Sequence, residues 1–270
     1  MRLYKTSIFI IFLTLITICT FYYEVDAKKL YIKIYEEKKN EIIVTTEHAK
    51  IHIEKNYLSE KEIYEISQKI ENGIVKVKDY LGKKYLNFNL TESKIKYFIK
   101  DGSFISDATS SSGRIRLSNV KKNRSPYLHE TVHVLANKYY KYTYRWLSEG
   151  LAVYLDDYFG GDTPYSNSEK NSNELARQII NNNEYKEVVN YFPDAYFSSK
   201  KERSAFYILS ASFVKFIENE YGKDKLLKIY NSADSEDITD TKLKQLKVED
   251  IVNKTLEQLK QEWLNYIEEK

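Results

Sequence analysis

One five-residue motif, His129-Glu130-Thr131-Val132-His133, places two histidines four positions apart within an apolar run. On an α-helix, side chains four residues apart lie one above the other, about 6 Å apart along the axis. Both imidazoles can therefore bind one ion. Glu130 falls on the neighbouring row, where its carboxylate lies beside the ion without binding it, as a general base requires. The motif constrains the fold because it needs a rigidly held helix and a third ligand from another element.

The third ligand is expected to be Glu149. In one class of zinc site, Gly and His stand three and six residues after the second histidine, but Ala136 and Tyr139 occupy those positions here. Glu149 follows His133 by sixteen residues (149 − 133 = 16), which leaves room for a helix end, a turn and a second helix. The sequence therefore predicts one Zn²⁺ bound by His129, His133 and Glu149. The alternative is a surface helix whose histidines are solvated.

At these residues the sequence resembles the gluzincin metallopeptidases, which include thermolysin-like proteases and zinc aminopeptidases, and it is most similar to bacterial peptidase MA-like domains. The segment His129–His133 resembles their metal-binding helix, and Trp146–Ala152 resembles their glutamate helix. The stretch Tyr207–Ile217, followed by Tyr221-Gly222, resembles the helix after the site. The resemblance covers the chain from about residue 58 to its C-terminus and implies a zincin-like fold that hydrolyses peptide bonds.

The resemblance also implies roles for two further residues. Glu130 would be the general base, and a Tyr or His from the helical half would stabilise the oxyanion. Tyr207 is the candidate for that second role, because its position matches the family helix. The other histidines, His48 and His52, lie on a predicted strand, where a spacing of four separates them by about 13 Å. They are expected on an exposed polar face, away from the zinc.

Three functions are compatible with these residues. An exported zinc endopeptidase that acts on proteins or peptides is preferred. An aminopeptidase would carry a Gly-x-Met-Glu-Asn run before the metal helix, and this chain has none. A surface binding or adhesion module on a catalytically silent zincin fold is the third alternative, although such a module would not need Glu130.

The chain departs from the thermolysin pattern at the position four residues after the ligand glutamate, where Val153 replaces an aspartate. The group that orients a ligand histidine is therefore open: Asp156, Asp157 or a backbone carbonyl could serve. Asp156, Asp157 and Asp162 lack a recognisable calcium loop, so calcium is not predicted.

The first 27 residues have the pattern of an export signal. Arg2 and Lys5 precede an apolar stretch, and Val25-Asp26-Ala27 is a plausible cleavage site. If the segment is retained instead, residues 7–23 would attach the protein to the membrane. Either way we expect the rest of the chain outside the cell.

The only cysteine, Cys19, lies in this segment, so no disulfide is expected. The net charge of +3 is too small to indicate a nucleic-acid partner.

The remaining pattern predicts an α+β fold with an α/β subdomain at 28–160 that carries the metal site and a helical subdomain at 161–270. Strands are expected within residues 28–55, at Ile95–Ile99 and at Ile115–Leu117, with a loop over 102–113. Residues 113–117 are the candidate edge strand beside the cleft. Capping boxes at Ser59 and Thr255 begin amphipathic helices, and Ser125-Pro126 is expected to begin the metal helix.

Overall fold

The computed structural model describes residues 34–102, 104–136, 144–162, 171–194, 199–233 and 248–269. The export segment expected at 1–27, with its apolar stretch at 7–23, lies outside these ranges. Among the helices of the described ranges, none combines the length and the apolar character that a membrane span requires.

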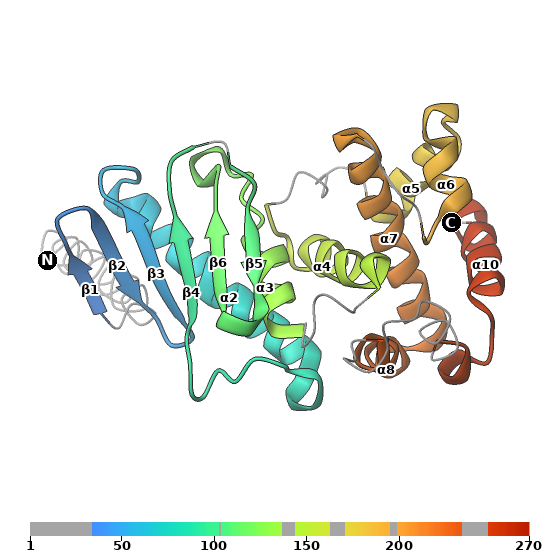
Figure 1. The fold of residues 1–270 in the computed structure, drawn as a ribbon, viewed down its shortest axis with the longest axis horizontal. Coiled ribbons are helices and arrows are strands. Elements are labelled where there is room, and N and C mark those ends of the chain that lie inside the picture. The colour runs from blue at the N-terminus through green and yellow to red at the C-terminus, as the bar shows by residue number, and fades with distance from the viewer. Residues whose placement is uncertain are drawn as a thin grey trace, which may run out of the picture.

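The N-terminal part is a mixed six-stranded sheet in the order β1-β2-β3-β4-β6-β5. β3, β4 and β6 run parallel to one another, whereas β1, β2 and β5 pair antiparallel to their neighbours. In Figure 1 this sheet forms one end of the molecule and a group of helices forms the other, so the fold is α+β, as predicted. The strands are β1 (Ile34–Glu37), β2 (Glu41–Thr45), β3 (Ala49–Glu54), β4 (Ile95–Ile99), β5 (Asp107–Thr109) and β6 (Arg114–Leu117).

Helix α2 (Glu60–Tyr85) covers the inner face of the sheet. It begins with the predicted capping box, in which the Ser59 backbone N–H donates to the Glu62 carboxylate at 2.7 Å. Its apolar residues recur at helical spacing and are buried, and the inner side chains of the strands alternate in the same way. The core between helix and sheet includes Ile63, Ile70, Ile74, Val77, Ile51, Ile53, Tyr97, Ile99, Ile115 and Leu117.

The segment before β6 differs from the prediction. Residues 102–113 are not simply a loop, because they contain β5 and a short 3₁₀ helix at Ser110–Ser112. β5 lies outside β6, so residues 113–117 do not form the edge of the sheet. Its three residues, Asp-Ala-Thr, have no apolar alternation, and the strand is defined by backbone pairing to β6. A pattern based on hydrophobicity could not detect it.

The C-terminal part is helical, as expected. Its last helix begins at the predicted Thr255 capping box. There the backbone N–H of Gln258 donates to the Thr255 hydroxyl at 3.2 Å. Trp263 on that helix donates its indole N–H to Ser212 at 3.0 Å inside the core. The helices are α4 (Arg145–Phe159), α5 (Ser172–Ile180), α6 (Lys186–Tyr191), α7 (Lys200–Tyr221), α8 (Lys223–Ala233) and α10 (Leu256–Glu269).

Helix α4 connects the two parts, because it packs against α3 (Tyr127–Ala136) on one side and against α7 on the other. The contact with α7 is unusually close at Gly150. A Cβ atom there would lie 2.6 Å from the Ser210 carbonyl oxygen and 2.8 Å from a methyl group of Val214. Glycine is thus required immediately after Glu149, and it fixes the distance between that residue and α7.

Candidate metal centre

Helix α3, which carries His129 and His133, is buried along its whole length. The hydroxyl of Thr131 donates to the Tyr127 carbonyl at 2.6 Å and lies 2.7 Å from the Tyr97 hydroxyl, so Tyr97 on β4 donates to Thr131. At the other end of the helix, the Ser110 hydroxyl donates to the His133 carbonyl at 2.9 Å. These bonds fix α3 against the sheet and the Ser110–Ser112 turn.

The start of α3 differs slightly from the prediction. The helix begins at Tyr127, after Pro126, whose carbonyl accepts from the Glu130 backbone N–H at 2.9 Å. The hydroxyl of Ser125 is buried and makes no hydrogen bond, so its side chain does not cap the helix.

The three predicted ligands meet at one point. The Nε2 atoms of His129 and His133 lie 3.0 Å apart, and Oε2 of Glu149 lies 3.3 Å from the first and 3.5 Å from the second. In a tetrahedral zinc site with bonds of about 2.0–2.1 Å, ligand atoms are separated by about 3.3–3.4 Å. The spacing therefore fits one ion of that size, and the group is the one metal-binding cluster found among the described residues.

The electrostatics of the cluster also favour a cation. All three residues are only 5% exposed. Burial lowers the pKa of His129, but the hydrogen bond to Glu149 and the charges of Glu130, Glu149 and Asp156 raise it more, so that it exceeds the ordinary value. Burial acts to raise the pKa of Glu149, whereas the charge of His133 and hydrogen bonds from both histidines hold it well below its usual range. Without a metal, a proton shared with the histidines has to balance the buried carboxylate.

Sequence reasoning missed Ser148, which contacts the ring of His133 on the side away from the other two candidate ligands. The Ser148 hydroxyl lies 3.4 Å from Nδ1 of His133, the ring nitrogen that points away from the cluster. If a metal ion were bound at Nε2, Nδ1 would carry the proton and could donate it to Ser148. The only feature of the sequence that could have indicated this contact is that Ser148 directly precedes the candidate ligand Glu149. Nδ1 of His129 is buried and has no hydrogen-bond partner.

Glu130 lies next to both histidines on α3 and is 6% exposed. Burial raises the pKa of its carboxyl group, the charges of His129 and His133 lower it, and the result lies above the ordinary value. A carboxylate with a raised pKa holds a proton better near neutral pH, which suits a general base. The charge of Asp107 on β5 also acts to raise the pKa of Glu130, and β5 packs against α3.

The Tyr207 ring, on α7, lies 6.3 Å from the ring of His129 with an angle of 25° between their planes. It is half-buried, in contrast with the fully buried Phe206 beside it. The structure therefore brings the fifth predicted residue, Tyr207, close to His129 from the helical part of the chain.

The other two histidines do not form an exposed polar face as expected. Both are half-buried, and each is bonded to a carboxylate. Nδ1 of His48 lies 2.6 Å from Glu71 on α2, and Nδ1 of His52 lies 3.0 Å from Glu41 on β2. Glu71 also accepts from the Thr46 hydroxyl at 2.6 Å, so this pair joins the β2–β3 turn to α2. The sequence prediction missed the carboxylates because they come from other elements.

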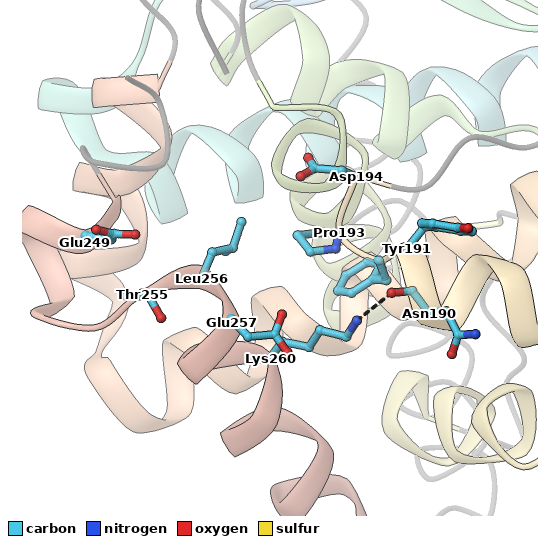
Figure 2. Close-up of a pocket in the computed structure, with 10 residues that line it drawn as sticks. Asn190, Tyr191, Pro193, Asp194, Glu249, Thr255, Leu256, Glu257 and Lys260 are labelled. Carbon is cyan, nitrogen blue, oxygen red and sulfur yellow. Dashed lines mark hydrogen bonds between the residues drawn. The ribbon is translucent and has the colours of Figure 1, made fainter. Parts of the chain in front are cut away.

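A separate cavity of about 330 Å³ lies between α6 and the start of α10. Figure 2 shows that its wall includes the carboxylates of Asp194, Glu249 and Glu257 and the amine of Lys260, which donates to the Asn190 carbonyl at 3.0 Å. None of the candidate metal ligands lines this cavity, so it is not the metal centre.

Comparison of the chain with protein-family models and with curated proteins gives no match. The evidence for function therefore comes from the residues and their geometry. What they define is a buried His129, His133 and Glu149 group that could hold one metal ion.

Proposed function

We propose that this protein is an exported zinc metallopeptidase that hydrolyses internal peptide bonds in proteins or peptides. The observation that supports this most strongly is the convergence of two Nε2 atoms and one carboxylate oxygen within 3.0–3.5 Å of one another. Two imidazoles and one carboxylate, with the fourth position open, are the donor set of catalytic zinc in peptidases. The sequence resemblance to gluzincins and the export pattern at residues 1–27 supply the substrate class and the location.

The residues around the cluster can carry out the proton transfers of hydrolysis. A zinc ion bound there would supply a Lewis acid that acidifies water and polarises a carbonyl group. Glu130, with its raised pKa, would take the proton from the attacking water and pass it to the departing amine. Tyr207, whose ring lies 6.3 Å from that of His129, would donate its hydroxyl proton in a hydrogen bond to the oxyanion.

The edge of the sheet offers a place for an extended substrate. β5 packs against α3, and within the described part of the chain no strand pairs with its outer side. A peptide in extended conformation could bind there by backbone hydrogen bonds, which do not depend on its sequence. Its scissile bond would then lie near Glu130, on which the charge of Asp107 already acts.

The experiment that tests this proposal compares the full chain with its Glu130→Gln variant. Both proteins, purified in mild detergent, are analysed for bound zinc and then incubated with a mixed peptide library. We expect one zinc per chain in both and cleavage at internal bonds by the wild type alone. Equal cleavage by the two proteins would contradict the role of Glu130. Bound zinc without cleavage by either would favour the binding module, and release of N-terminal residues alone would indicate an aminopeptidase.

A further inference from the structure

His129 has one ring nitrogen that the proposed metal site does not explain. Its Nε2 atom faces His133 and Glu149, whereas its Nδ1 atom is buried and has no hydrogen-bond partner. A histidine that binds metal through Nε2 carries its proton on Nδ1 and usually donates it to a carboxylate, a carbonyl or a water molecule. A buried donor without a partner destabilises the folded protein. A group that accepts this proton is therefore expected nearby.

Asp156 is the candidate for that group. It follows Glu149 by seven residues on α4, which is two helical turns, so both side chains lie on the same face of the helix. Its side chain is fully buried, and its charge is one of those that raise the pKa of His129. Along α4, Ser148 contacts His133, Glu149 contacts both histidines, and Asp156 acts on His129.

The other aspartate considered from the sequence, Asp157, faces elsewhere. It is half-buried, and the groups that act on its carboxyl are Lys215 on α7 and the backbone N–H of Ser172 on α5. It is not among the charges that act on His129. In this structure Nδ1 makes no hydrogen bond to a backbone carbonyl or to Asp156.

The chain closes tightly over the Asp156 carboxylate after α4 ends. Gly161 donates its N–H to the Asp156 carbonyl at 2.7 Å, and a Cβ atom on Gly161 would lie 2.1 Å from Oδ1 of Asp156. Only glycine leaves room for the carboxylate at this position. The Gly160-Gly161 turn therefore shields a buried charge from solvent in addition to ending the helix.

We propose that Asp156 is the positioning residue for His129, and that in the metal-loaded protein its carboxylate accepts the Nδ1 proton of His129, directly or through one water molecule. A carboxylate has about four acceptor positions, so it can take this bond in addition to others. The bond would fix the tautomer and the ring orientation that direct Nε2 to the metal. This role takes the place of the aspartate that thermolysin-like sequences carry four residues after the ligand glutamate, where this chain has Val153. The inference rests on the metal site of the proposed function.

The first experiment measures zinc affinity of the full chain by competition with a chromogenic chelator, for the wild type, Asp156→Asn and Asp157→Asn. We expect Asp156→Asn to weaken binding about 10- to 100-fold. Asp157→Asn is the matched control and should change affinity less than about threefold. Equal affinities for wild type and Asp156→Asn would overturn the positioning role while leaving the metal site intact. A wild type that binds no zinc would instead overturn the proposed function itself.

A second measurement needs no variant, because Asp156→Asn could unfold the protein. In zinc-loaded, ¹⁵N-labelled wild type, imidazole ¹H–¹⁵N correlation spectra report the proton on each ring nitrogen. We expect the Nδ1 proton of His129 to be observable, shifted downfield and slow to exchange with solvent. A His129 ring whose Nδ1 proton exchanges rapidly and shows no downfield shift would contradict a hydrogen bond to Asp156.

Discussion

The Nε2 atoms of His129 and His133 lie 3.0 Å apart in the protein interior, and both face the Glu149 carboxylate. Two nitrogen acceptors at this distance can be satisfied only by a shared proton or a cation. The three side chains are therefore arranged as a group that could hold one metal ion.

The first prediction distinguishes the proposed role of Glu149 as a metal ligand from that of Glu130 as a general base. Glu149→Gln removes the charge that faces both histidines, and we expect zinc affinity to fall more than about 100-fold, since even residues behind the ligands contribute 10–100-fold. Glu130→Gln, on the same cluster, should retain zinc and lose peptide cleavage. Titration calorimetry on both variants distinguishes them. Similar zinc affinities for the two would contradict the assignment of Glu149 as a ligand.

The second prediction concerns pH. In the metal-free protein the pKa of His129 is above 6.5 and that of Glu149 is below 4.5. The Glu149 contribution to stability is present above about pH 4.5, and the His129 contribution is complete below about pH 6.5 and lost as pH rises through its folded pKa. Zinc requires a deprotonated His129. We therefore expect the difference in Tm between zinc-loaded and metal-free protein to increase from pH 5.5 to pH 8. A difference that is constant over this range would contradict the raised pKa.

The third prediction tests Tyr207. Its ring lies 6.3 Å from that of His129, and the phenylalanine variant keeps the ring while it removes the hydroxyl. We expect Tyr207→Phe to lower kcat about 10²-fold or more with little change in KM or zinc affinity, as for loss of one oxyanion donor. Steady-state kinetics on one cleaved peptide supplies the measurement. Wild-type kcat would show that the hydroxyl takes no part in the reaction.

The sequence alone predicts those features of the structure that depend on residues close together in the chain. The capping box at Ser59, the apolar spacing of α2 and the histidine spacing on α3 are each set by residues within a few positions of one another. The parts that it missed depend on contacts between distant segments. β5 pairs through its backbone, Glu71 reaches His48 from another element, and Gly150 is required by Ser210 on α7. None of these contacts leaves a periodic pattern.

The fourth prediction follows from the close contact at Gly150. In Gly150→Ala, the new Cβ would lie 2.6 Å from a backbone oxygen that cannot move without shifting α7. We expect a loss of about 1–3 kcal/mol in the free energy of unfolding, as for other overpacked interiors, and weaker zinc binding because Glu149 is adjacent. Urea denaturation gives the first value. An unchanged midpoint would mean that α4 and α7 are not packed this closely.

The fifth prediction concerns Glu71, the α2 carboxylate that is hydrogen-bonded to the β2–β3 turn. Glu71 is 2% exposed and accepts from both Thr46 and His48. Glu71→Ala leaves these donors without a partner, and we expect a cost of about 1–3 kcal/mol in stability with no change in zinc affinity. Glu41→Ala, which removes the more exposed partner of His52, is the control and should cost less than about 1 kcal/mol. A loss of zinc binding in Glu71→Ala would mean that the turn and the metal site are coupled.

The most direct test of the account is the location of the metal. Anomalous diffraction at the zinc edge, from crystals grown with zinc, should give one strong peak about 2 Å from Nε2 of His129, Nε2 of His133 and a carboxylate oxygen of Glu149. A structure in which this position holds no anomalous scatterer, or in which Glu149 points away from the two histidines, would contradict the central claim.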